Sequence, residues 1–179
     1  EKWSARIASR NHARISALTD VVARDYLKLE ADLGLPPSTV PDIGCGLDLD
    51  QVLSLPPREK RHDVVFLARM HEKKGVFELP GVWEAVLQSH PAARLVVIGE
   101  GPHRKRTMEL FQERGLADAV RFTGAISEEE KNQLLLEGRV GLSLSYEEGW
   151  GLSITEFLAA GLPVVAYSLP VFQSVFPGQ

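Results

Sequence analysis

The chain has 179 residues, of which 44% are hydrophobic and 25% are charged, and its formal net charge is −4. This composition indicates a globular protein with enough residues for one ordinary domain with a core, and the acidic balance argues against nucleic acid as the main partner. The single cysteine, Cys45, excludes a disulfide within the chain, and no apolar stretch approaches the length of a transmembrane helix. We therefore expect a cytoplasmic protein.

The first third of the chain has an irregular pattern. Ile15–Leu18 is a candidate for a short strand, and Thr19 or Asp20 is suited to cap a helix that runs to Leu33 and ends at Gly34. Another short strand is expected over Val40–Ile43. The proline pair within Leu55–Pro57 then indicates a linker, so we place a domain boundary between residues 57 and 58.

From Asp63 onward, short apolar runs alternate with segments of helical period. The runs are continuous, which is typical of parallel strands that are buried on both faces. Strands that alternate with helices predict an α/β fold with a doubly wound parallel sheet. The strands are expected over residues 64–68, 95–98, 120–123, 140–144 and 164–166, and the helices over residues 76–89, 102–114, 128–137 and 154–160.

The most informative stretch contains two carboxylates, Glu148 and Glu156, which lie eight positions apart. Gly149 and Gly151 have no Cβ, so their backbone N–H groups can approach a ligand closely, and the start of the helix that follows favours phosphate. Carboxylates beside a phosphate would repel it. Glu148 and Glu156 are therefore better suited to accept hydrogen bonds from sugar or ribose hydroxyls.

A basic loop over Arg69–Gly75 follows the first regular strand, at its carboxyl end. Arg69, Lys73 and Lys74 could neutralise a diphosphate there without a metal. The loop belongs to the same rim of the sheet as Gly149–Gly151, and ligands of such sheets bind at this rim.

Other candidates carry less weight. Gly99-Glu100-Gly101 lacks the third glycine of a dinucleotide fingerprint, because position 104 is Arg104. The Asp-x-Asp pattern at Asp48 and Asp50 could hold a divalent metal, but it lies in the linker region. His71 and His103 fall in loops on the expected binding rim and could touch a ligand.

Several stretches together resemble the retaining group 1 (family 4) glycosyltransferases. The segment from Glu148 to Glu156, followed by Ala159–Val165, is similar to the E-x7-E signature of that family. Further agreement in order and spacing is found in Phe66–Arg69 with Lys74-Gly75, in Val97–Pro102, in Val120–Gly124 and in Gly46-Leu47-Asp48.

The resemblance implies a GT-B fold, in which two Rossmann-like domains enclose a cleft and the second domain binds a nucleotide sugar. It implies that Arg69 and Lys74 contact the donor diphosphate, that Glu148 binds donor-sugar hydroxyls and that Glu156 binds ribose hydroxyls. Amides of Gly149, Trp150, Gly151 and Leu152 would help to hold the phosphate or the sugar. It also implies that Arg69, Lys74 and Glu148 are catalytic, with no metal and no cofactor beyond the donor.

The chain departs from the family pattern in three places. Cys45 stands where the family usually has Asn, Trp150 replaces the commoner Phe, and the acceptor-binding first domain is almost wholly absent. We expect residues 1–57 to be the tail of that domain plus a linker, and residues 58–179 to be the donor-binding domain, truncated at its C-terminus. The fragment alone could be inactive.

The expected function is sugar transfer from a nucleotide-diphosphate sugar to an acceptor hydroxyl. A non-catalytic nucleotide- or sugar-binding module and a GT-B nucleotide-sugar epimerase stay open as alternatives. The acceptor could be a glycan, a lipid or a small molecule. The missing domain could bring the protein to the inner face of the membrane.

Overall fold

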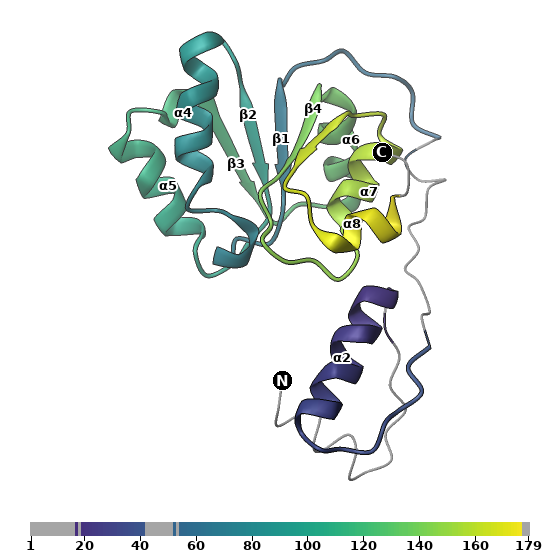
Figure 1. Cartoon of the computed structure of the whole chain (residues 1–179). Helices are drawn as coiled ribbons and strands as arrows, with labels where there is room; N and C mark the ends of the chain where they lie inside the picture. The colour runs from purple at the N-terminus through teal and green to yellow at the C-terminus, as the bar shows by residue number, and fades with distance from the viewer. Residues whose placement is uncertain (1–16, 18, 42–51, 53, 177–179) are drawn as a thin grey trace. The chain divides into compact units, whose positions relative to one another are not determined.

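The computed structural model describes residues 17, 19–41, 52 and 54–176 (Figure 1). The chain divides into two compact units. The sheet unit comprises Leu47–Glu147 and Leu152–Tyr167, and the helical unit comprises Glu1–Gly46, Glu148–Gly151 and Ser168–Gln179. None of the helices in the described ranges has the length and apolar composition needed to cross a bilayer.

The sheet unit is built on five parallel strands in the order β3-β2-β1-β4-β5 (Figure 1). This arrangement confirms the predicted doubly wound α/β fold, because the order reverses between β1 and β4. Each strand coincides with a predicted one to within one residue at either end. The bounds are Val64–Leu67 for β1, Leu95–Ile98 for β2, Val120–Gly124 for β3, Val140–Ser143 for β4 and Val164–Ala166 for β5.

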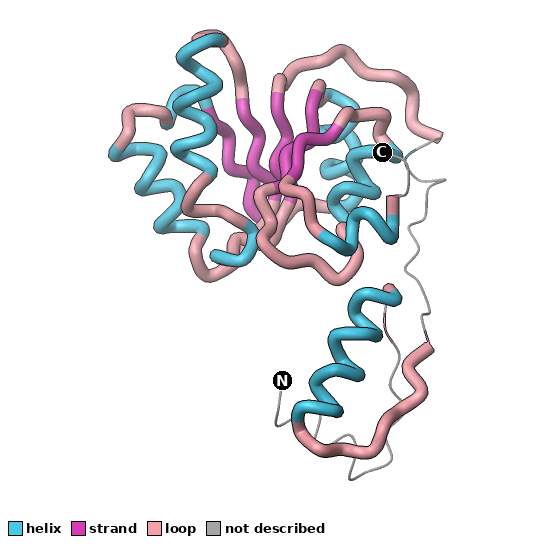
Figure 2. The backbone as a smooth tube through the Cα atoms, in the orientation of Figure 1, coloured by secondary structure: helices cyan, strands magenta, loops and turns pink. Residues whose placement is uncertain are grey.

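Helices cover both faces of the sheet (Figure 2). On one face, α4 (Leu79–Ser89) and α5 (Arg104–Glu113) close a core that contains Trp83, Phe66 and Phe111. On the other face, α6 (Glu128–Glu137) and α7 (Leu152–Ala159) close a core that contains Leu135 and Phe157. The short turns η1 (Glu72–Lys74) and η2 (Ala117–Ala119) precede α4 and β3.

Local sequence signals explain where the helices begin. The Ser127 hydroxyl accepts a hydrogen bond from the Glu130 N–H at 3.1 Å, as a capping serine should, and this confirms the predicted start of α6. The prediction of a helix from Val76 was wrong, because η1 and the left-handed Gly75 precede α4, which begins only at Leu79. Pro80 is tolerated because it lies in the first turn.

The helical unit contains α2 (Asp20–Asp32) and α8 (Pro170–Val175). Thr19 caps α2 as predicted, since its hydroxyl accepts from the Val22 N–H at 3.3 Å. The sequence did not reveal α8. Val40 and Pro41 are not in a strand, which corrects the expectation there, while the rest of the expected strand Val40–Ile43 and most of the expected strand over Ile15–Leu18 lie outside the described residues.

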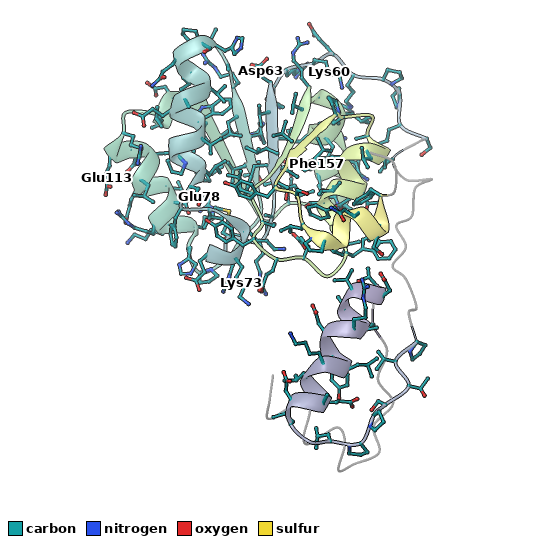
Figure 3. All side chains as sticks on the ribbon, viewed as in Figure 1. Lys60, Asp63, Lys73, Glu78, Glu113 and Phe157 are labelled. Carbon is teal, nitrogen blue, oxygen red and sulfur yellow. The ribbon has the colours of Figure 1, made fainter. Side chains whose placement is uncertain are left out.

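Phe157 is central to the packing of α7 on the sheet (Figure 3). Its side chain is completely buried, and a Cβ placed on Gly141 of β4 would collide with its ring. Glycine at that position is therefore what lets the ring lie directly on the strand.

Removal of this ring should be costly. We predict that Phe157→Ala lowers the free energy of unfolding by about 3–5 kcal/mol, because a large cavity is left in the core. The neighbouring Leu158 is 40% exposed, so Leu158→Ala should cost under about 1 kcal/mol. Urea denaturation compares the two, and equal losses would contradict the assignment of Phe157 to the core.

The segment before β1 is held against the end of α6. The Arg61 and His62 N–H groups both donate to the Glu137 carbonyl, at 2.8 and 3.2 Å, and Arg58 Nη1 lies 3.4 Å from the Glu137 carboxylate. His62 Nε2 is buried 3.5 Å from the other carboxylate oxygen. Burial disfavours the charged ring and lowers the pKa of His62, although Glu137 opposes this effect.

Stability should therefore depend on pH through His62. Because the pKa of His62 is lower in the folded chain, the unfolded chain takes up a proton first as the pH falls below about 6.5. The free energy of unfolding therefore decreases from that pH downward, until the pH has passed the folded pKa. We predict that His62→Gln flattens the fall in unfolding free energy as the pH drops below about 6.5. The exposed His90, changed to Gln, is the control. Urea denaturation at several pH values checks this, and an unchanged slope in His62→Gln would contradict it.

Candidate functional site at the carboxyl edge of the sheet

The carboxyl ends of β1 and β4 meet where the strand order reverses. In open α/β sheets, the crevice outside such a reversal is where ligands bind, since the crossover helices leave on opposite faces there. The loop after β1 carries Arg69 and Lys74, and the loop after β4 leads to Glu148. The loop with Arg69 and Lys74 and the loop that leads to Glu148 therefore begin at neighbouring strands.

The basic loop after β1 has a defined conformation. His71 caps η1, because its Nδ1 accepts a hydrogen bond from the Lys73 N–H at 3.3 Å. Gly75 ends the turn with a left-handed φ of 69°. Arg69 is exposed, and it forms no ion pair within the part of the chain that the structure describes, whereas Lys74 is half-buried.

Direct contacts tie this loop to the loop after β4. The Tyr146 N–H donates to the Lys73 carbonyl at 2.9 Å, and the Lys73 ammonium pairs with Glu147. Gly75 lies so close to Leu144 that a Cβ would collide with the Leu144 backbone. Lys73 lies at the lower edge of the sheet in Figure 3, opposite Asp63, which precedes β1.

The loop after β2 packs against the other side of the basic loop. Gly99 and Gly101 have positive φ values of 132° and 154°, and a Cβ on either would collide with the carbonyl of Ala68 or Met70, respectively. The Met70 N–H donates to the Glu100 carbonyl at 2.8 Å. The Gly-x-Gly pattern is therefore explained by close packing of two backbones.

A tyrosine pair joins β5 to this edge. The rings of Tyr146 and Tyr167 stack with centroids 6.2 Å apart, and the Tyr167 hydroxyl donates to Glu78 at 2.7 Å. A hydrogen bond to the same carboxylate raises the pKa of Tyr146 to about 12, so this phenol is protonated at neutral pH. The sequence did not reveal this cluster, because its members come from three separate segments. Figure 3 labels Glu78 at the start of α4.

Glu156 lies on α7, where its carboxylate meets Lys131 of α6 at 2.5 Å. The same ammonium lies 2.5 Å from the exposed Glu128. Burial disfavours the charged amine, but hydrogen bonds to both carboxylates outweigh it and raise the pKa of Lys131, which is therefore charged at neutral pH. The sequence offered only one hint of this residue, a single cation directly after the run Glu128–Glu130.

The predicted ligand loop Glu148–Gly151 belongs to the helical unit. The first three of its residues are half-buried, and Gly151 is buried with a φ of 96°. A side chain at Gly151 would be strained by the positive φ, and its Cβ would also touch the ring of Phe172. Both effects disfavour a larger residue at this position. The Thr19 hydroxyl donates to the Gly149 carbonyl at 3.3 Å. Leu152, the last residue of the predicted set, is exposed and begins α7 directly after this loop.

The remaining candidates make other contacts or lie outside the described residues. His71 and His103 contact each other with ring centroids 5.6 Å apart, and His103 also meets Phe77 at 5.0 Å. Asp48, Asp50 and Cys45 lie outside the described residues. Across the residues that are described, no three His, Cys, Asp or Glu side chains gather in a way that could hold a metal ion.

Comparison with known families gives a match over residues 51–177 to the family described as glycosyl transferases group 1. The chain belongs to this family. The match includes both loops of the candidate site and the whole of the sheet unit's five strands.

Characterised relatives share modest identity. One component of the human phosphatidylinositol N-acetylglucosaminyltransferase is 30% identical over 121 residues, which is 66% of this chain and 25% of that protein. The GDP-mannose:cellobiosyl-diphosphopolyprenol alpha-mannosyltransferase of Xanthomonas oryzae is 24% identical over 169 residues, which is 93% of this chain and 43% of that protein. The chain thus spans less than half the length of these relatives.

Solved structures agree on the fold. TarM of S. aureus, crystallised with fondaparinux, alpha-GlcNAc-glycerol and UDP, superposes with a TM-score of 0.77 at 22% identity. The superposition covers 92% of this chain and 31% of TarM. At this level of identity, the likeness shows that the chain has part of the GT-B glycosyltransferase fold.

The crowding around Gly75 gives a test of the loop packing. We predict that Gly75→Ala lowers the free energy of unfolding by at least about 1–2 kcal/mol, because alanine is strained at positive φ and its Cβ would collide with Leu144. Gly81 of α4 has no atom within 4 Å of a built Cβ, so Gly81→Ala should instead stabilise by about 0.5–1 kcal/mol. Urea denaturation measures both, and a neutral Gly75→Ala would refute the packing described.

Proposed function

We propose that the chain is the donor-binding portion of a retaining glycosyltransferase, which moves a sugar from a nucleotide-diphosphate sugar to an acceptor hydroxyl. Residues 58–179 form the donor-binding domain in this proposal, and residues 1–57 are the tail of an acceptor-side domain with its linker. The hydrogen bond from the Tyr146 N–H to the Lys73 carbonyl carries the proposal, because it joins the basic loop to the loop that leads into the E-x7-E segment.

Arg69 and Lys74 bind the diphosphate in this proposal. When the bond between the sugar and the diphosphate breaks, negative charge grows on the leaving phosphate oxygens, and cations already in position stabilise it. The exposed guanidinium of Arg69 has no competing carboxylate among the described residues, which supports this role. Backbone amides of Gly149–Leu152, at the start of α7, would add neutral donors to the phosphate or sugar. No metal is needed for this chemistry.

The two carboxylates bind hydroxyl groups. Glu148 accepts from hydroxyls of the donor sugar, and it is proposed as catalytic together with Arg69 and Lys74. Glu156 accepts from the ribose. The bond between the anomeric carbon of the sugar and the diphosphate breaks, the acceptor oxygen bonds to that carbon with the anomeric configuration kept, and the hydroxyl proton passes to the leaving diphosphate. This step requires the acceptor-side domain.

The relatives suggest the class of acceptor. Two of them are named for lipid or lipid-linked substrates, phosphatidylinositol and a diphosphopolyprenol. The TarM structure contains UDP, which bears on the donor nucleotide. We propose a glycan, lipid or small-molecule acceptor, and a cytoplasmic location with contact to the inner face of the membrane through the acceptor-side domain.

Binding of nucleotides tests the donor site. We predict that one of UDP, GDP and ADP raises the thermal midpoint of the chain, while NAD does not. Saturation to about 100 times the dissociation constant would add ~2.7 kcal/mol to stability. Arg69→Ala should weaken binding of that diphosphate about tenfold to a hundredfold, because a charge-assisted hydrogen bond is lost. Isothermal calorimetry measures the change.

A matched control is available at the opposite edge of the sheet. Arg139 is also exposed, but it precedes β4 and pairs with Asp63 at 3.4 Å, so Arg139→Ala should bind the diphosphate normally. Binding of the free nucleoside should be equal in all three proteins. If Arg69→Ala bound the diphosphate as tightly as Arg139→Ala, the proposed phosphate site would be wrong.

Incubation with the preferred sugar nucleotide separates transfer from the alternatives. Release of the sugar to water or to an acceptor supports the transferase, whereas interconversion of two sugar nucleotides would support an epimerase. Binding without turnover, in a protein that also carries an acceptor-side domain, would support a non-catalytic module.

A further inference from the structure

Lys131 is an unusual lysine for the first turns of a helix, because it is shielded from water. Only 13% of its side chain is exposed, and its partner Glu156 is 15% exposed, whereas Glu128 is 73% exposed. The pair of Lys131 and Glu156 also joins two different helices, α6 and α7. Of the two ion pairs that Lys131 makes, the one with Glu156 is thus the sheltered one.

Because the pair is sheltered, Lys131 affects how well the Glu156 carboxylate can accept hydrogen bonds from a ligand. A half-buried carboxylate without a counter-charge would turn toward water, and this would weaken it as an acceptor at its present position. Lys131 contacts one oxygen, Oε1, at 2.5 Å, which fixes the rotation of the carboxylate and leaves Oε2 and a second lone pair of Oε1 to accept. Two neighbouring hydroxyls, as on a ribose, need an acceptor whose two oxygens are held in one orientation.

We propose that Lys131 is a positioning residue, which holds the Glu156 carboxylate in one orientation so that it recognises the 2′- and 3′-hydroxyls of the donor nucleotide. The inference rests on the proposed function, since it takes Glu156 as the ribose ligand. Lys131 acts through Glu156 and does not bind phosphate, because both of its neighbours are carboxylates. The chain would then tell a ribonucleotide from a deoxyribonucleotide with two residues from two helices.

The test compares three forms of one nucleotide. The probe is whichever of UDP, GDP and ADP binds the full chain most tightly, together with its 2′-deoxy and 3′-deoxy forms. Calorimetry measures their dissociation constants for the wild-type chain, Lys131→Met, Lys131→Arg, Glu128→Gln, Glu156→Gln and the double variant Lys131→Met/Glu156→Gln. Circular dichroism and thermal midpoints show which variants are folded.

We expect the wild type to prefer the ribonucleotide by about tenfold or more, since a charge-assisted hydrogen bond is at stake. Lys131→Met should lose this preference and Lys131→Arg should keep it, because arginine retains the charge. Glu128→Gln should also keep it, since Glu128 is 73% exposed and pairs with Lys131 within α6. In the Glu156→Gln background, Lys131→Met should have no further effect on the preference, which is the sign of two residues acting as one unit.

Two outcomes would overturn the inference, and they differ in what they leave standing. A folded Lys131→Met that keeps the wild-type preference removes the role of Lys131 and leaves the donor site intact. A wild type that binds ribo- and deoxyribonucleotides equally, or binds none, removes the proposed role of Glu156 and the inference with it. If Lys131→Met fails to fold, loss of the preference in Lys131→Arg decides against the inference in the same way.

Discussion

The pairing of β1 with β4 is the constraint on which the candidate site depends. These strands are far apart in sequence, yet they lie next to each other because the chain first adds β2 and β3 on one side of β1 and then crosses back through α6. Parallel strands send all of their following loops to one edge. A cationic loop and a glycine-rich, carboxylate-bearing segment thus start from adjacent strands, although neither segment has any local reason to meet the other.

Close backbone packing then holds the cationic loop between its neighbours. Gly99 and Gly101 press on it from the side of β2, and Gly75 presses on Leu144 from within it. At each of these three glycines there is room for the hydrogen atom on Cα but not for a methyl group. Because the loop is held between two neighbours, Arg69 and Lys74 project from a closely packed backbone. Charges that do not have to reorganise when a ligand's charge changes stabilise it most effectively. The glycines near this edge therefore help to place the charges of Arg69 and Lys74, because they allow the backbones around the loop to pack closely.

The sequence predicted those features that depend on neighbours in the chain. Continuous apolar runs revealed all five strands, and the serine and threonine caps gave the starts of α6 and α2 within one residue. Prediction from the sequence failed where tertiary packing decides the local conformation. The apolar start at Val76 suggested a helix, but a left-handed Gly75 delayed it, and the short α8 has no periodic pattern long enough to detect. The contact of Lys131 with Glu156 joins two helices, so no spacing rule could reveal it.

Cations near the carboxyl edge differ in what surrounds them, and this difference separates their roles. Lys131 is neutralised by Glu128 and Glu156, so an approaching phosphate would meet a net negative group there. Lys73 is likewise opposed by Glu147. Arg69 has no carboxylate partner in the described ranges, so its charge can act on an anion. Since carboxylates repel phosphate and accept from hydroxyls, the proposed function would use this edge to hold the two chemically different halves of a nucleotide sugar apart. In that proposal, the order of cations and carboxylates along the edge orients the donor.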